Sequence, residues 1–230
     1  ACMVLAMSAI NVPPITRAKA GSVLHSMGEG IGFVAHNRIF TFLIGMTFLN
    51  SFFGMSYIFL LPIYATDILN VGSEGLGQMH AASGVGAVIM AVAAAILSKS
   101  RRKGLFLIAG AVVFGISLIL FAYSTHYYWS LTLLFMGGAA ATFYMVMVQT
   151  TLQALVPDHL RGRVFSIYSL TWSLLPLGAL QAGLIADWVS PQFAIALGGV
   201  TVAMFALVVA LTSHRVRTMG IVTQEAMETA

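Results

Sequence analysis

The chain has 230 residues, of which 59% are hydrophobic and only 8% are charged, whereas a soluble domain carries roughly 25% charged residues. This composition excludes an ordinary soluble globular protein and indicates an integral membrane protein. The net charge of +4 arises from basic residues spread over short loops. A nucleic-acid-binding domain needs a concentrated basic surface, so no nucleic-acid partner is expected.

The N-terminal part of the chain, residues 1–38, is predicted to precede a bundle of six transmembrane helices. Residues 1–10 are apolar but reach only about half of the roughly 20 residues that span a bilayer, and we interpret them as the tail of a truncated preceding transmembrane helix. Residues 11–38 are predicted to be a cytoplasmic connector containing an amphipathic helix at the membrane interface. The apolar residues on one face of that helix are Val23, Leu24, Met27, Ile31 and Val34.

Charged residues divide the rest of the chain into long uncharged runs. The longest run, 104–157, is about twice the length of one membrane span. We therefore divide it at the aromatic segment 124–129, whose composition is typical of a membrane interface. Residues 214–230 are predicted to form a cytoplasmic tail. The predicted transmembrane helices of this all-α integral membrane fold are 39–64, 75–98, 104–123, 129–155, 164–186 and 191–213.

The basic residues are distributed unevenly over the predicted loops. Loops 65–74, 124–128 and 187–190 contain no Lys or Arg, so all 11 basic residues lie on the opposite side. Basic residues concentrate on the cytoplasmic side of membrane proteins. The distribution therefore predicts that both termini of this multi-pass protein are cytoplasmic.

The turn between the fourth and fifth predicted spans, 157–163, concentrates charge in an otherwise apolar region. Pro157 is expected to end one helix, and Asp158 is expected to cap the next helix. Arg161 and Arg163 are expected to have a partner, either Asp158, a lipid phosphate or an acidic group in the missing part of a longer protein. Two interpretations remain open: a turn that only sets topology and caps a helix, or a cytoplasmic latch made by Asp158, Arg161 and Arg163.

Neutral polar residues are the candidates for ligand contact inside the membrane. No Asp, Glu, Lys or Arg lies inside a predicted span, so these helices provide no intramembrane carboxylate for proton coupling. Polar residues at helical spacing either line a cavity for a small-molecule substrate or hydrogen-bond neighbouring helices. The residues predicted to line the cavity are Asn50, Tyr57, Thr142, Gln149, Gln153, Trp172 and Gln181.

Two further patterns concern helix packing and shape. Small residues recur every fourth position in the second span and predict a close helix–helix contact. Prolines are predicted to kink the first and fifth spans. The small residues are Ser83, Ala87, Ala91 and Ala95, with Ala82, Gly86 and Ala94 beside them, and the prolines are Pro62 and Pro176.

Catalytic motifs are absent from the sequence. It contains no phosphate-binding P-loop, no serine nucleophile elbow and no histidine pair at metal-ligand spacing. We therefore expect no enzyme, no catalytic residues, no metal site and no cofactor.

The connector, the six spans, the basic loop 98–104 and the ProAspHisLeuArgGlyArg segment at 157–163 together resemble the C-terminal half of a major facilitator superfamily transporter. Bacterial drug and siderophore exporters of the enterobactin-exporter type are the most similar members. Loop 98–104 matches the family's GlyXXXAspArgXGlyArg pattern only in part, because it lacks the aspartate and the leading glycine.

The resemblance implies a fold, partners and an activity. The six helices are expected to form a 3+3 inverted repeat, to pair with an N-terminal six-helix half, and to hold a small-molecule substrate near the midplane. Membrane lipid is the other expected partner, in the inner membrane of a bacterial cell. The implied activity is secondary active export by alternating access. Alternatives are a membrane-embedded subunit of an ATP-driven transport complex, which needs a nucleotide-binding partner, and a membrane enzyme or scaffold.

Overall fold

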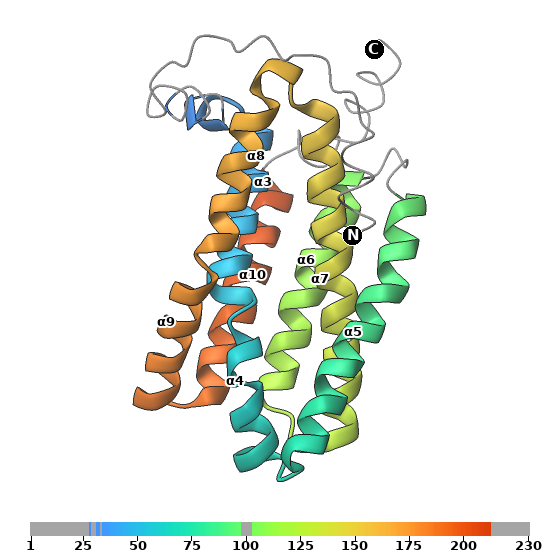
Figure 1. The fold of residues 1–230 in the computed structure, drawn as a ribbon, viewed down its shortest axis with the longest axis vertical. Helices are drawn as coiled ribbons and strands as arrows, with labels where there is room; N and C mark the ends of the chain where they lie inside the picture. The colour runs from blue at the N-terminus through green and yellow to red at the C-terminus, as the bar shows by residue number, and fades with distance from the viewer. Residues whose placement is uncertain (1–27, 29–30, 33, 98–102, 213–230) are drawn as a thin grey trace, which may run out of the picture.

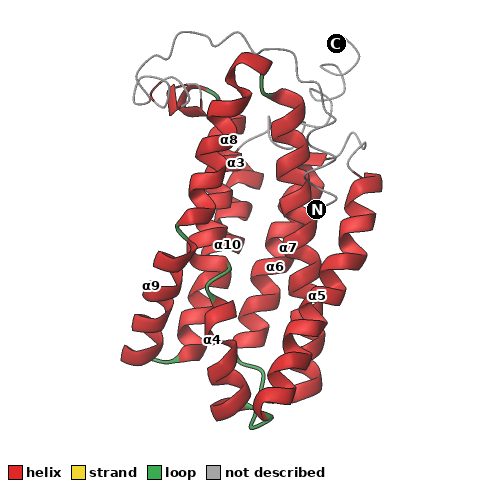
Figure 2. Ribbon diagram, in the orientation of Figure 1, coloured by secondary structure: helices red, strands yellow, loops and turns green. Residues whose placement is uncertain are grey.

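A computed structural model describes residues 28, 31–32, 34–97 and 103–212. All regular secondary structure in these residues is helical (Figure 2). Six helical segments are long and apolar enough to cross a membrane, so the predicted all-α membrane fold is confirmed. These segments are Arg38–Ile68, Gly72–Leu97, Lys103–Ala122, Tyr127–Leu155, Leu160–Trp188 and Pro191–Thr212.

The helices extend beyond the predicted spans at several ends. α5 begins at Gly72, before Glu74, and the fifth span begins at Leu160, before both arginines of the 157–163 turn. Charges are tolerated at these helix ends because the side chains reach the polar interface. Placing span boundaries at charged residues therefore predicts helices that are too short. Segments 1–10 and 214–230, and most of 11–38, lie outside the described residues.

The spans pack as an elongated bundle (Figure 1). α5 packs mainly against α7, and α6 packs against both α7 and α10. α5 lies at one side of the bundle and α9 at the other (Figure 1). The bounds of these helices are α5 Gly72–Leu97, α6 Lys103–Ala122, α7 Tyr127–Leu155, α9 Leu175–Trp188 and α10 Pro191–Thr212.

Glycines bring several helices into backbone contact, among them α6 with α10 and α5 with α7. Between α6 and α10, the carbonyl oxygen of Gly115 lies 2.5 Å from the place that a Cβ on Gly199 would occupy, and the reverse distance is also 2.5 Å. Between α5 and α7, a Cβ on Gly86 would meet the carbonyl of Phe135. Only glycine permits such close approaches, which replace hydrophobic burial as the source of helix association in lipid.

The contact face of α5 includes only part of the predicted small-residue pattern, since a Cβ on Gly138 of α7 would meet the Ser83 carbonyl and Gly86 is buried. The buried residues of α5 are Gly75, Met79, Gly86 and Ala94, whereas Ala95 is exposed. With 3.6 residues per turn, each four-residue step advances about 40° around the helix. The predicted stripe therefore rotates away from α7 along the length of α5.

The first span is interrupted near its middle. It comprises α3 (Arg38–Leu49), a π-helical turn (Asn50–Gly54), α4 (Tyr57–Ile63) and a second π-helical turn (Tyr64–Ile68). In the first π-turn, the backbone N–H of residue 55 donates to the carbonyl five residues earlier at 2.7 Å. Such wide turns are frequent at functional sites.

The position of this interruption differs from the predicted proline kink. Pro62 lies inside α4, and the interruption falls at Met55 and Ser56 instead. The Ser56 hydroxyl donates to the carbonyl of Phe53 at 2.7 Å, which supplies a partner to a carbonyl at the end of the π-turn. The π-turn and its serine account for the break at Met55 and Ser56, and a kink at Pro62 stays a prediction.

The fifth span is divided into α8 (Asp158–Ser173) and α9 (Leu175–Trp188). The break at Leu174 lies two residues before Pro176, the second residue of α9, in agreement with the predicted interruption, because proline is tolerated in the first turn of a helix but not in its interior. At the other end, Pro157 occupies the N-cap position of α8. The helix therefore begins with Asp158, one position earlier than the predicted capping role requires.

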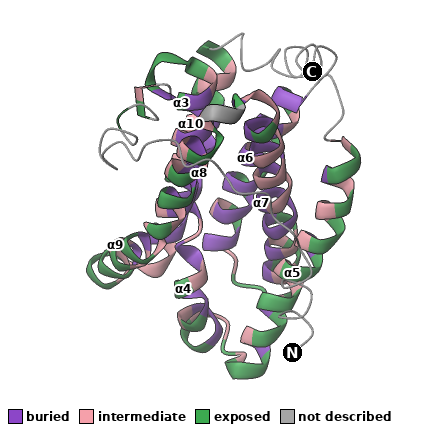
Figure 3. Cartoon of the chain, turned by 45° about the horizontal axis from the view of Figure 1, so that its top comes forward, coloured by how far each residue is buried: buried purple, intermediate pink, exposed green. Residues whose placement is uncertain are grey.

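The six spans are buried to very different degrees (Figure 3). Only 11% of the most apolar stretch of Gly72–Leu97 and 17% of that of Leu160–Trp188 is buried inside the bundle, against 44–56% for the other four spans. The two weakly buried spans contain the helices at the two sides of the bundle, α5 and α9. Each of these two spans therefore leaves a larger share of its residues uncovered than any of the other four.

Candidate functional site

A cavity of about 540 Å³ lies where α7 ends and α8 begins. Gln153, Arg161, Gly162 and Phe165 line it. The exposed guanidinium of Arg161 donates to the backbone carbonyl of Gln153 at 3.4 Å, which ties the start of α8 to the end of α7. Gln153 and Arg161, predicted as a cavity residue and a latch residue, thus belong to the same surface.

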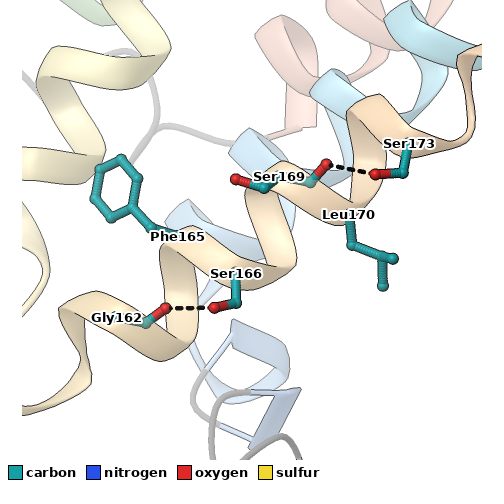
Figure 4. Close-up of a pocket in the computed structure, with 6 residues that line it drawn as sticks. All are labelled: Gly162, Phe165, Ser166, Ser169, Leu170 and Ser173. Atoms are coloured by element: carbon teal, nitrogen blue, oxygen red, sulfur yellow. Dashed lines mark hydrogen bonds between the residues drawn. The ribbon is translucent and has the colours of Figure 1, made fainter.

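A second cavity, of about 450 Å³, continues from the first along α8 (Figure 4). The Ser166 hydroxyl donates to the Gly162 carbonyl at 2.8 Å, and the Ser173 hydroxyl donates to the Ser169 carbonyl at 3.4 Å. These bonds satisfy the serine protons within the helix, while each oxygen can still accept a hydrogen bond from a ligand. The lining residues are Gly162, Phe165, Ser166, Ser169, Leu170 and Ser173.

The exposed face of α8 is polar although α8 belongs to a membrane span. Arg161, Gly162, Ser166 and Ser169 are all exposed. Polar and ionisable groups in membrane spans face water or protein rather than lipid chains. We name the residues that line the two cavities the α8 polar face, and its chemistry suits hydrogen bonding to a polar solute.

A tyrosine joins two of the predicted cavity residues beside the α8 polar face. The hydroxyl of Tyr168 on α8 lies beside the side chains of Gln149 on α7 and Trp172 on α8. The Tyr168 ring packs edge-on against Phe165 with ring centroids 6.1 Å apart. Gln149 and Trp172 are half-buried, so this Tyr168 cluster presents an amide and an indole at the edge of the bundle.

A second polar group lies deeper in the bundle. Asn50, at the start of the first π-turn, is fully buried, and its amide lies beside the Tyr144 hydroxyl of α7. Tyr144 in turn neighbours Tyr168. The structure therefore connects Asn50 with Gln149 and Trp172 through two tyrosines.

Three other predicted cavity residues lie apart from this group. Tyr57 is buried, packs edge-on against Phe114 at 6.3 Å, and has its hydroxyl beside Ser83. Thr142 and Gln181 are half-buried on α7 and α9. Among the described residues, no hydrogen bond or ring contact links these three side chains to Tyr168, so their role in a cavity stays a prediction.

Sequence reasoning identified neither Tyr144 and Tyr168 nor the Ser166 and Ser169 hydroxyls of the α8 polar face. Tyr168 lies four residues before Trp172, which places both on one helical face, and this spacing was an available signal. Tyr144 lies five residues before Gln149, about 140° around the helix from the polar stripe of α7. Only the packing of α7 against the first span brings Tyr144 into the group.

The two latch arginines occupy the first turns of α8. Arg161 is exposed and Arg163 is half-buried, and Asp158 is the first residue of the helix. The contact between Arg161 and Gln153 is compatible with a latch that forms in one conformation. That function stays a prediction. No cluster of three or more His, Cys, Asp or Glu side chains occurs in the described part of the chain.

Six apolar helical spans with a polar face on one of them define a multi-pass integral membrane protein. The sequence matches the Major Facilitator Superfamily over residues 1–179 and again over 42–223. These matches cover most of the chain, so it belongs to this family of membrane transporters. The resemblance inferred from the 157–163 turn and the span pattern is thereby confirmed, and the family indicates a transporter rather than an enzyme.

The chain is also similar to a protein named multidrug efflux pump Tap, from Mycolicibacterium fortuitum. The two sequences are 27% identical over 197 residues, which covers 81% of this chain and 46% of the pump. The chain thus spans about half the length of the curated relative that it matches.

Proposed function

We propose that the chain is the C-terminal six-helix half of a secondary active exporter of small molecules. Export proceeds by alternating access, with a second six-helix half completing the substrate path. The observation that carries the proposal is the α8 polar face, which opens beside the Tyr168 cluster on a span that is largely unburied. The similarity to a multidrug efflux pump supports export as the direction of transport.

The burial pattern supports a second half as the partner of this bundle. An exposed row containing Arg161, Ser166 and Ser169 is unfavourable against lipid chains, so water or protein faces it. A second half that packs beside α5 and α9 encloses this row between the two halves. Substrate then meets hydroxyl groups along α8 and an aromatic and amide cluster at Gln149 and Trp172.

This chemistry favours amphipathic, partly aromatic substrates, either drug-like or siderophore-like. Indole and phenol rings stack on planar groups, and the Gln149 amide both donates and accepts hydrogen bonds. No acidic side chain occurs at the Tyr168 cluster among the described residues. Selection therefore rests on shape, ring contacts and neutral hydrogen bonds.

The charge distribution supports a location in the bacterial inner membrane with both termini cytoplasmic. A direct test places single cysteines in the complete transporter after Cys2→Ala. We expect an impermeant thiol reagent added outside to label positions 70, 126 and 189, and labelling at 100, 160 and 218 only after the cells are opened. An inverted pattern at two of these loops would contradict the six-span topology.

Transport itself is tested in cells that produce the complete transporter and are loaded with a fluorescent aromatic dye. We expect dye efflux that stops when a protonophore collapses the ion gradients and persists when ATP alone is depleted. The reverse dependence would identify an ATP-driven complex instead.

Variants connect this efflux to the site. Gln149→Ala and Trp172→Ala should each raise the dye concentration needed for half-maximal efflux severalfold, because the side chains that contact the dye are lost. Gln192→Ala is the matched control, since Gln192 is also half-buried but lies on α10, away from the Tyr168 cluster. Equal effects of the two glutamine variants would show that Gln149 does not contact the substrate.

A further inference from the structure

A cavity of about 400 Å³ lies between the start of α3 and the end of α10. Both helix ends lie at the end of the bundle where α8 begins (Figure 1). The cavity shares no lining residue with the α8 polar face, so it is a separate site. Its lining residues on the two helices are Arg38, Thr41 and Phe42 of α3 and Phe205, Val209 and Thr212 of α10.

One wall of this cavity is apolar. The rings of Phe42 and Phe205 stack with their centroids 5.9 Å apart and an angle of 17° between their planes. Val209 follows Phe205 by one helical turn, so both lie on the same face of α10. The neighbouring side chains on α10 are exposed, as expected for a helix surface in contact with lipid chains. These exposed neighbours are Leu207, Val208 and Leu211.

The other end of the cavity is positively charged. Arg38, the first residue of α3, is exposed there, and none of the described lining residues is acidic. An anion beside Arg38 also meets the N-terminal end of α3, where the helix dipole favours negative charge. The sequence after Thr212 continues with Arg215 and Arg217. The charge of this region therefore favours an anionic ligand.

Two threonines add hydrogen-bond acceptors to the cavity. The Thr41 hydroxyl donates to the Val34 carbonyl at 2.6 Å, and the Thr212 hydroxyl donates to the Val208 carbonyl at 2.7 Å. Because both protons are used within the chain, the two oxygens remain as acceptors. A ligand that combines an anion for Arg38 with hydroxyl donors for the threonines matches this set of groups.

We propose that the cavity binds an anionic phospholipid. The phosphate lies at Arg38, donors of the headgroup reach Thr41 and Thr212, and an acyl chain follows the wall made by Phe42, Phe205 and Val209. The site joins the first turn of the first span to the last turn of the sixth. It does not depend on the proposed export function, because no residue of the Tyr168 cluster takes part.

The position of the cavity suits a phospholipid better than a free anion or a neutral lipid. Arg38 begins the first span and Thr212 ends the sixth, so the cavity crosses the boundary between the membrane interface and the hydrocarbon, as a phospholipid does. Basic residues at the membrane surface attract anionic lipids. A free phosphate leaves the apolar wall without a contact, and a zwitterionic lipid neutralises its own phosphate.

The first experiment is photo-cross-linking of the complete transporter, purified in detergent, with phosphatidylglycerol that carries a diazirine near the start of one acyl chain. We expect cross-links concentrated on segments 38–42 and 205–212 and displaced by unlabelled phosphatidylglycerol. Equal displacement by phosphatidylcholine would show that the site recognises only an acyl chain, and displacement by inorganic phosphate that it recognises only an anion. Either result overturns the proposal, as do cross-links of equal density on the exposed faces of α5 and α9.

Substitutions at Arg38 test the role of its charge. Arg38→Gln should weaken binding of phosphatidylglycerol about tenfold, because a charge-assisted hydrogen bond is lost, and Arg38→Lys should restore most of the affinity. Arg161→Gln is the matched control, since Arg161 is also exposed at this end of the bundle but lies outside the cavity. Unchanged binding in Arg38→Gln, or an equal loss at segments 38–42 and 205–212 in Arg161→Gln, would contradict the site.

The second experiment compares melting temperatures with and without lipid. A ligand that binds the folded state raises the Tm, so we expect phosphatidylglycerol to raise it by several degrees and phosphatidylcholine to raise it much less.

Val209→Phe fills the cavity and should abolish the difference between the two lipids. Val208→Phe changes the adjacent exposed residue, which does not line the cavity, and should preserve that difference. The Tm without lipid shows whether each variant is folded. If Val209→Phe is not, Arg38→Gln at an exposed position provides the same test. A full difference between the lipids in a folded Val209→Phe or Arg38→Gln variant would overturn the proposal.

Discussion

The α6–α10 contact and the α8 polar face belong to one bundle but differ in the groups that form them. Between α6 and α10, the backbones at Gly115 and Gly199 are in direct contact, and the space between them is too small for a Cβ atom. Along α8, hydroxyl groups and an arginine remain exposed beside open cavities. The first region depends on shape alone, whereas the second depends on which polar groups are presented.

Because the two regions depend on different properties, we expect substitutions in one to affect stability and substitutions in the other to affect transport. A change of volume at a backbone contact forces helices apart and acts on folding. A change on an exposed polar face leaves packing intact and acts on whatever meets that face. Four substitutions test the separation, ordered here from the largest expected effect to the smallest.

Gly115→Ala should have the largest effect. The new Cβ would lie 2.5 Å from the Gly199 carbonyl and 2.7 Å from Ala203, so α6 and α10 must separate, at a cost of about 3 kcal/mol. Fluorescence-detected size-exclusion chromatography with a temperature series measures the loss. Gly183→Ala is the control, because nothing lies within 4 Å of that position, and an equal loss in both variants would show that helix packing is not the cause.

Gly86→Ala should destabilise the bundle less, by about 1–3 kcal/mol. Its Cβ would meet the Phe135 carbonyl, but α5 lies at the side of the bundle and can move outwards. Gly84→Ala is a closely matched control on the same helix, with open space around it, and should be neutral or stabilising by up to about 1 kcal/mol. The comparison fails if Gly84→Ala is the more harmful of the two.

Arg161→Ala should alter the conformational equilibrium while leaving the Tm unchanged. Loss of a charge-assisted contact worth about 1–3 kcal/mol shifts the ratio of outward-open to inward-open states roughly five- to 150-fold. The expected direction is towards the inward-open state, with slower turnover. Labelling of a cysteine at Ser173 from each side of the membrane reports the shift. Unchanged labelling and transport in the Arg161→Ala, Arg163→Ala double variant would reduce the turn to a solvated connection.

Ser166→Ala should have the smallest effect, below about 0.5 kcal/mol on stability, because its hydroxyl bonds only to the Gly162 carbonyl within α8. Ser166→Phe should leave the Tm similarly unaffected but reduce dye efflux severalfold, since the ring fills the cavity beside Phe165. Efflux assays and melting curves on the two variants together separate these effects. A large drop in Tm for the phenylalanine variant would place Ser166 in a packing surface instead.

The 157–163 turn illustrates how far local sequence reasoning reaches. Its proline and charges located the boundary between two spans, and they carried the family resemblance. Asp158 was predicted to be the N-cap of α8 but is its first helical residue, because Pro157 occupies the N-cap position. The contact of Arg161 with Gln153 was not predictable, since the accepting group is a backbone carbonyl, which every residue carries.

The packing face of α5 illustrates the opposite case. A pattern of small residues predicted a close contact, and a close contact exists at Ser83 and Gly86 of that pattern, whereas Ala95 is exposed. Helical periodicity defines several possible stripes on an apolar helix. The choice among them depends on the crossing geometry with α7, which no single helix encodes.

The class of protein and the number of membrane spans could be predicted from the sequence, because hydropathy and charge act locally along the chain and accumulate over about 20 residues at a time. The family followed from the resemblance carried by the 157–163 turn and the span pattern. The tertiary structure alone decided where the first span breaks, which face of each helix is buried, and that Tyr144 and Tyr168 link Asn50 to Gln149. These features arise from contacts between residues far apart in sequence. In an apolar bundle such contacts are selected by shape, for which composition carries almost no signal.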